Sequence, residues 1–237
     1  MARVRTDERI VVAMAELLRR QGYAATGIKQ IVEASDAPIG SIYHHFAGGK
    51  RDVAAAALRQ SGAAYGELVT MMLAPYDDIA EGVAAAFAAA AETIASSDWL
   101  NMCPVGTVAG EVADAEPSLR EVGAEVIDSW IDQGTTLFVA RGLPEPDARS
   151  LIQAVVAALE GAFIMARTQR SVEPLLAAGQ AMRAYAQALT VRDQSARDQS
   201  ARDQSARDQS AARQRGSRPA TTGSESGEIR AAARGRR

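Results

Sequence analysis

The sequence predicts an all-α protein with an N-terminal three-helix domain of the helix-turn-helix type and a larger helical body. Alanine is abundant, apolar residues recur at spacings of three and four, and no segment shows the strict apolar-polar alternation of a strand. Proline or glycine stands at nearly every joint between the predicted helices. The chain has 237 residues and is 47% hydrophobic, so it can bury a core without a disulfide scaffold.

The N-terminal domain, residues 1–60, begins with a helix that places its apolar residues on one face. Thr6 is a candidate N-cap for this helix, and Gly22 is the expected stop. Two short helices and one longer helix follow, and the longer one leads into the body and ends before Pro75. We expect these helices over residues 7–21, 28–34, 38–44 and 50–73.

The body, residues 61–190, is predicted to hold five further helices and to form a dimer. They are expected over residues 77–96, 104–113, 117–140, 146–170 and 173–190. The last two helices each carry a stripe suited to a helix–helix seam, with small residues that permit close packing. The stripes comprise Leu151, Val155, Ala158, Leu159, Ala162 and Ala166, and Leu175, Met182 and Leu189. We therefore predict a homodimer through these two helices.

The C-terminal segment, residues 191–237, changes in composition. The motif RDQS recurs at 192, 197, 202 and 207, a period of five that matches neither a helix nor a heptad. Because large apolar residues are almost absent, this segment is predicted to be disordered. Two interpretations stay open: an inert tail, or a tail whose seven arginines between Arg213 and Arg237 add sequence-independent attraction to phosphate.

Charge and targeting signals point to a cytoplasmic protein that contacts no membrane. The net charge is +3 over residues 1–60, −11 over residues 61–190 and +5 over the rest. A weakly basic head on an acidic body suits a protein that approaches a polyanion with its head alone. The N-terminus lacks the apolar stretch of a signal peptide, and the single cysteine, Cys103, fits a reducing compartment.

Residues 26–50, TGIKQIVEASDAPIGSIYHHFAGGK, have the spacing of a helix-turn-helix. A helix of about two turns, which the Thr26 hydroxyl can cap, is followed by a tight break at residues 35–37 and a second short helix. Ile42 and Phe46 anchor this second helix to the core. Gly40 inside this second helix costs about 1 kcal/mol relative to alanine unless another molecule approaches its backbone closely. DNA would be such a molecule if this helix lay in its major groove.

The same segment resembles the TetR family of repressors, in the run TGIKQIVEASDAPIGSIYHHF and the lysine that follows. The spacing FAGGK, and the later stretches CPVGTVAGEVADAEPSLR and ALEGAFIMARTQRSVEPL, resemble the branch of the lincomycin-resistance repressor and its flavonoid-responsive relatives, to about residue 190. Asp36 stands where the family usually has glycine in the turn. Aspartate tolerates a positive φ better than most residues, so the turn can form.

The resemblance implies a homodimeric repressor that binds near-palindromic double-stranded operator DNA and is released by a small apolar effector, without a cofactor. Two recognition helices would enter major grooves about 34 to 36 Å apart, or a multiple of that distance. Base edges would be met by Ile39, Gly40 and Ser41. Phosphates would be met by Thr26, Lys29, Tyr43, His44 and Lys50. No Arg, Asn or Gln lies between Pro38 and Phe46, so the operator sequence stays open.

The body is expected to hold the effector between its helices, against apolar walls. The predicted contacts are Trp99, Met102, Trp130 and Phe163. No catalysis or metal binding is expected, because the only histidines are adjacent in the N-terminal domain and cannot pair with Cys103. The carboxylates Glu111, Asp114 and Glu116 are interpreted as a solvated face. An activator of the same fold, or a helical small-molecule-binding protein that has lost DNA binding, remain alternatives.

Overall fold

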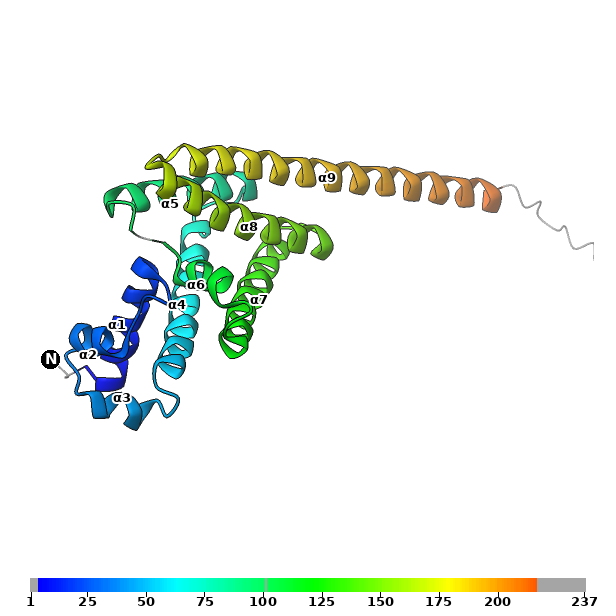
Figure 1. The fold of residues 1–237 in the computed structure, drawn as a ribbon. Coiled ribbons are helices and arrows are strands. Elements are labelled where there is room, and N and C mark those ends of the chain that lie inside the picture. The colour runs from blue at the N-terminus through cyan, green and yellow to red at the C-terminus, as the bar shows by residue number, and fades with distance from the viewer. Residues whose placement is uncertain (1–3, 101, 217–237) are drawn as a thin grey trace, which may run out of the picture. The chain divides into compact units, whose positions relative to one another are not determined.

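The computed structural model describes residues 4–100 and 102–216. Every regular element in these two stretches is a helix (Figure 1). The helices are α1 (Thr6–Gln21), α2 (Ile28–Ser35), α3 (Ile39–His45), α4 (Lys50–Leu73), α5 (Ile79–Ser96), α6 (Pro104–Val112), α7 (Pro117–Ala140), α8 (Glu145–Gln169) and α9 (Glu173–Gly216). The first eight follow the predicted boundaries closely, and the all-α prediction is confirmed.

The N-terminal helices share one buried cluster. Ile10 of α1, Ile31 of α2, Ile42 of α3 and Leu58 of α4 are at most 1% exposed. Helix α6 and the first half of α7 add apolar residues of their own to this cluster, namely Val105, Val108, Val112 and Leu119. Although α6 follows α5 in the chain, its packing therefore places it with the N-terminal helices.

A second cluster forms the core of the body, between the end of α4, α5, α7, α8 and the start of α9. Its most deeply buried large side chains are Phe87, Ile94, Phe138, Leu151 and Leu175. By length and composition alone, α5 and α8 would each be apolar enough to cross a membrane, a test that core helices also pass. Both contribute buried residues to this cluster.

The two stripes predicted for the dimer seam lie mostly inside the protomer instead. On α8, Leu151, Ala162 and Ala166 are at most 4% exposed, and on α9, Leu175 and Leu189 are also buried. Sequence periodicity identified a buried face correctly but assigned it to the wrong partner, because a helix facing its own core and one facing a second copy have the same pattern. The prediction that these particular residues form the seam is therefore wrong.

Helix α1 begins one residue earlier than its predicted cap implies. Thr6 is the first helical residue, Arg5 occupies the N-cap position, and no side chain caps the helix. Gly22 ends the helix as predicted: its φ is +81°, and its N–H donates to the Leu18 carbonyl at 3.0 Å.

The RDQS repeat is helical, which contradicts the prediction of disorder from residue 191 as far as Gly216. By contacts the chain divides into residues 1–193 and 194–237, and within the second unit the helix α9 continues to Gly216. A period of five places each aspartate four residues before the next arginine, the favourable order for helical ion pairs. Gln199 also donates to Asp203, four residues on, at 2.9 Å. Local pairing thus supports a helix without a core. Residues 217–237, which hold five of the seven arginines between Arg213 and Arg237, lie outside the described residues.

Candidate nucleic-acid interface and internal cavity

The turn between α2 and α3 is formed by Asp36 in the left-handed conformation, with φ 48° and ψ 44°. Its N–H donates to the Glu33 carbonyl, and its carboxylate lies 3.5 Å from Arg9 of α1. The predicted tolerance of aspartate for positive φ at this position is confirmed. The sharp turn sets α3 across the end of the N-terminal cluster.

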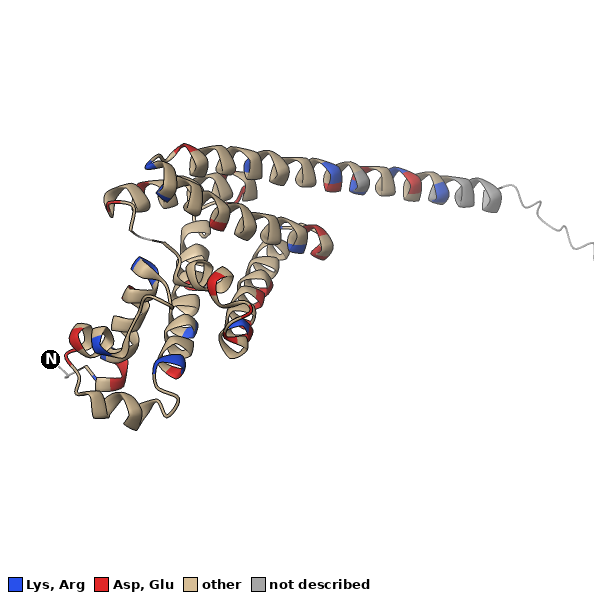
Figure 2. Cartoon of the chain, viewed as in Figure 1, with Lys and Arg blue, Asp and Glu red and all other residues tan. Residues whose placement is uncertain are grey.

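One face of α3 is open to solvent. Ile39 is 53% exposed and Tyr43 is 54% exposed, whereas Ile42, which faces the core, is fully buried. Gly40 and His44 lie on the same open face, and Ser41 is half-buried beside it. Helix α3 carries no lysine, arginine, aspartate or glutamate (Figure 2). The face is therefore uncharged and partly apolar.

The residues predicted to contact phosphate fall into two groups, exposed side chains and side chains engaged within the protein. Lys29 on α2 and Tyr43 and His44 on α3 are exposed. The Tyr43 ring also lies against Gly49, where a Cβ would come within 3.1 Å of it. These three side chains are accessible to a polyanion.

Two other predicted phosphate contacts are directed elsewhere. Thr26 is 1% exposed, and its hydroxyl donates to the Gly22 carbonyl at 2.7 Å. Gly27, rather than Thr26, is the N-cap of α2. Lys50 is half-buried, and its Nζ lies 3.9 Å from the centre of the Tyr23 ring. Burial lowers the pKa of Lys50, while the nearby Glu111 and Glu116 act in the opposite direction. Thr26 and Lys50 thus serve the fold in this structure.

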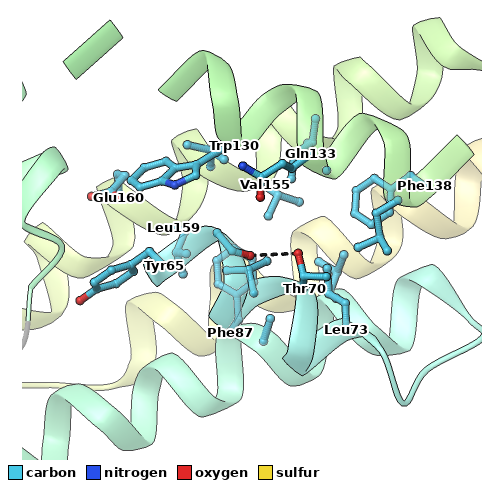
Figure 3. Close-up of a pocket in the computed structure, with 18 residues that line it drawn as sticks. Tyr65, Thr70, Leu73, Phe87, Trp130, Gln133, Phe138, Val155, Leu159 and Glu160 are labelled. Carbon is cyan, nitrogen blue, oxygen red and sulfur yellow. Dashed lines mark hydrogen bonds between the residues drawn. The ribbon is translucent and has the colours of Figure 1, made fainter. Parts of the chain in front are cut away.

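The body contains a cavity of about 80 Å³ between α4, α5, α7 and α8 (Figure 3). Its wall is almost entirely apolar. Tyr65, Trp130 and Glu160 lie at one end, and Leu73 and Phe138 at the other. The Trp130 indole N–H donates to the Gly62 carbonyl at 2.7 Å, outside the cavity lining. The indole therefore presents its apolar surface to the cavity.

Of the four predicted effector contacts, only Trp130 lines this cavity. Met102 and Phe163 are buried at 6% exposure in the body cluster, and Trp99 packs against that cluster from a loop with φ +64°. Residue type selected large apolar side chains but could not tell a cavity wall from ordinary core. Small residues define the cavity as much as large ones, since Gly66 and Gly134 line it.

Glu160 connects the cavity to the start of α6. Its side chain lines the cavity, and its carboxylate lies so close to Gly106 that a Cβ there would overlap it. Burial raises the pKa of Glu160 to about 7, an effect that a hydrogen bond with the Cys103 thiol partly opposes. Cys103 is the N-cap of α6, and burial raises the pKa of its thiol. A buried thiol of this kind is a poor nucleophile.

The other end of α6 holds the turn between α1 and α2. The Glu111 carboxylate accepts hydrogen bonds from the backbone N–H groups of Tyr23, at 2.8 Å, and Ala24, at 2.5 Å. Arg167 of α8 donates to the Arg20 carbonyl at 3.0 Å in the last turn of α1. The Glu111 side chain is exposed, as expected for a solvated face, but it also binds amides 87 and 88 residues away along the chain. Sequence alone carried no signal for this contact.

Side chains that could bind a metal ion do not cluster in the described part of the chain. Among the described side chains, no group of three or more His, Cys, Asp or Glu lies close enough to hold a metal ion. This part of the chain offers two surfaces for recognition: an exposed face of α3, and an apolar cavity in the body.

Both the N-terminal helices and the body match known protein families. Residues 10–57 match the family described as bacterial regulatory proteins, tetR family, and residues 79–181 match the C-terminal domain of LmrA/YxaF-like transcriptional regulators. An uncharacterized HTH-type transcriptional regulator of Mycobacterium tuberculosis is 32% identical over 173 residues, which cover 71% of this chain and 87% of the relative. The HTH-type transcriptional regulator LmrA of Bacillus subtilis is 30% identical over 169 residues, covering 71% and 90%.

Solved structures agree with this fold. A TetR regulator from Chloroflexus aurantiacus has a TM-score of 0.63 at 31% identity, covering 76% of this chain and 93% of the other. The regulatory protein TetR from Rhodobacter sphaeroides has a TM-score of 0.66 at 22% identity, covering 75% and 97%.

The fold and the two sites define a helix-turn-helix transcriptional regulator. The chain belongs to the TetR family, with an LmrA/YxaF-like C-terminal domain, as the sequence resemblance predicted. Its relatives are transcriptional regulators, and members of the family bind operator DNA and function as dimers.

Proposed function

We propose that this regulator is a cytoplasmic homodimeric repressor that binds a near-palindromic operator through α3 and leaves it when a small apolar molecule enters the body cavity. Residues 1–60 would bind DNA, and residues 61–190 would bind the effector and form the dimer. The observation that carries the proposal is the pairing of the open face of α3, which has no lysine, arginine, aspartate or glutamate, with the apolar cavity of the body; α6 contacts both parts.

On the DNA side, the proposed base-edge contacts are Ile39, Gly40 and Ser41, and the proposed phosphate contacts are Lys29, Tyr43 and His44. Their support is exposure: Ser41 is half-buried, and the other five residues are exposed, Lys29 on α2 and the rest on α3. Phosphate contacts fix the orientation of the helix, and base-edge contacts then select the sequence. Thr26 and Lys50 are left out because their side chains are engaged within the protein.

The dimer is proposed to form through faces of α8 and α9 that the protomer leaves uncovered. On each helix, exposed small or apolar residues follow at alternating spacings of three and four. They are Ala157, Gly161, Ile164 and Thr168 on α8, and Ala177, Ala181, Ala184, Ala188 and Val191 on α9. At Gly161 a Cβ would meet nothing within 4 Å, so a partner helix has room to approach.

The size of the cavity explains how an effector could act. Pockets that hold drug-sized ligands usually measure about 300–1,000 Å³, well above the 80 Å³ present here. A ligand must therefore push the surrounding helices apart. Helix α4 lines the cavity near Leu73 and packs in the N-terminal cluster at Leu58, so its displacement would move the DNA-binding domain. The separation of the two recognition helices would change, and operator affinity would fall.

The test uses the full chain and DNA selected by it from a random pool. A repressor of this kind should enrich a near-palindrome with half-sites about one helical turn apart, or a multiple of that distance, and bind it against scrambled competitor. Uncharged aromatic compounds should then be screened for Trp130 quenching and for release of that DNA. A compound that binds without altering operator affinity is not the effector, and enrichment of no sequence contradicts the proposal.

Two further measurements separate the remaining alternatives. A footprint that overlaps the core promoter supports repression, whereas one upstream of it supports activation. For the dimer, Ala184→Glu should produce monomers in sedimentation experiments, because it places a charge on the uncovered face of α9. Ala140→Glu, at the exposed end of α7, is the matched control and should leave the dimer intact.

A further inference from the structure

The open face of α3 is unusual for a surface that reads DNA, because its first side chain is aliphatic. Ile39 is the first residue of α3, and it is 53% exposed although isoleucine is among the residues most often buried. Two residues of the next turn, Tyr43 and His44, share this face. None of the polar side chains that commonly make bidentate contacts to guanine or adenine is present on α3.

The position of Ile39 on the helix is the one from which bases are read. In helix-turn-helix proteins the N-terminal residues of the recognition helix contact base edges, while later residues reach the backbone. Ile39 and Gly40 are the first two residues of α3, and Tyr43 and His44 belong to its second half. The Tyr43 ring also leans on Gly49, away from the first turn. The first position of α3 thus carries an aliphatic side chain, and the second is a glycine, which has no side chain.

Only one group in the major groove is complementary to an aliphatic side chain. The edges of G, C and A present hydrogen-bond donors and acceptors, whereas thymine also presents its C5 methyl group. Isoleucine beside a polar edge would bury an acceptor or donor without a partner, which is unfavourable. Beside a thymine methyl it removes apolar surface from water on both molecules.

We propose that Ile39 is a specificity-determining residue that selects thymine by contact with its C5 methyl group, at one position in each operator half-site. Gly40 lets the backbone of α3 come close enough to the base edge for this contact, because no Cβ stands between them. The inference rests on the proposed function, since it requires α3 to lie in the major groove.

The test uses the full chain and the operator selected by the unaltered protein. Each thymine is replaced by deoxyuridine, singly and then in symmetric pairs, which removes only the methyl group. At one symmetric pair we expect a loss of affinity of about fourfold for one half-site and about fifteenfold for both, the value of one buried apolar carbon per site. Replacements at the other positions should have smaller effects.

The protein variant makes the assignment specific to Ile39. Ile39→Ala should bind the unmodified operator about as weakly as the unaltered protein binds the doubly substituted one, and the same pair of uracils should then cost it nothing further. Val12→Ala is the matched control, because Val12 is a comparably exposed aliphatic residue on α1, and it should show the full uracil effect. Both variants should keep the melting temperature of the unaltered protein, since both side chains are exposed.

The outcomes separate this inference from the proposed function. If the unaltered protein selects no operator, the proposed function fails and the inference fails with it. If it binds a selected operator but no thymine pair is sensitive to uracil, or if Ile39→Ala keeps that sensitivity, the inference is overturned while the proposed function stands. A selected operator without a thymine in each half-site overturns it as well.

Discussion

Replacing Gly40 by alanine should raise stability and lower operator affinity at the same time. Gly40 is the second residue of α3, and a Cβ built there meets nothing within 4 Å in the free protein. Because alanine is favoured over glycine in helices, Gly40→Ala should stabilise the fold by about 0.5–1 kcal/mol. For a chain of this size, that corresponds to a rise of about 1–4 °C in the melting temperature.

The same methyl group would stand between α3 and the base edges. Forcing a methyl-sized group into a closely packed contact costs about 1–3 kcal/mol, so affinity for the operator should fall by about fivefold to 150-fold. Calorimetry gives the first quantity and fluorescence anisotropy with labelled operator the second. An unchanged affinity together with a higher melting temperature would refute the idea that the backbone of α3 approaches DNA closely. A lower melting temperature would show that Gly40 is packed against another part of the molecule.

Three further predictions concern the body and its link to the N-terminal helices. Glu111→Ala should lower the melting temperature by the equivalent of about 1 kcal/mol, since it leaves two backbone amides without their acceptor, while Asp114→Ala, its exposed neighbour, should not. Burial raises the pKa of Glu160 to about 7 from its ordinary value of 4.5, so the native state holds its proton more tightly than the unfolded chain does. The free energy of unfolding should therefore fall, by up to about 3 kcal/mol, as the pH rises from about 4.5 to about 7. Glu160→Gln should remove this slope in pH-dependent melting curves. Val155→Phe should fill the cavity, cost less than about 3 kcal/mol, retain operator binding and abolish ligand-induced release in the anisotropy assay.

The sequence predicted local features well wherever one residue type had one structural meaning. Gly22 stops α1 with a positive φ, and Asp36 takes the left-handed conformation that the turn requires. Helix boundaries followed from proline and glycine positions for the same reason. The helix-turn-helix was predictable because its geometry is specified almost wholly within residues 26–50.

The sequence could not predict which neighbouring group each side chain contacts. Leu151 and Ala166 have the periodicity of a seam, yet they pack into their own protomer. Phe163 has the size of a ligand contact, yet it belongs to the core. Thr26 has the chemistry of a cap or phosphate contact, yet its hydroxyl is used by the Gly22 carbonyl. In each case the chemistry of the residue was interpreted correctly, and only the fold decides which of several compatible neighbours it meets.

The prediction of disorder for the C-terminal segment failed for a different reason. Low complexity and the lack of apolar residues favoured disorder for residues 191–237, but the five-residue repeat puts opposite charges four residues apart along the helix. Composition predicts whether a segment can bury a core. It does not predict whether local pairs can support a solvated helix such as the one that extends to Gly216.

Helix α6 gives the structure a direct route between its two sites. At its start, Gly106 lies against the carboxylate of Glu160, which lines the cavity, and at its end Glu111 binds the amides of the α1–α2 turn. Because α6 has only nine residues, it can transmit a displacement as a rigid rod. A ligand that moved Glu160 would tilt α6, and Glu111 would carry that movement to the turn that precedes α2. Glu111→Ala should therefore weaken ligand-induced release of DNA more than it weakens DNA binding itself, and equal losses in both would place the coupling in α4 alone.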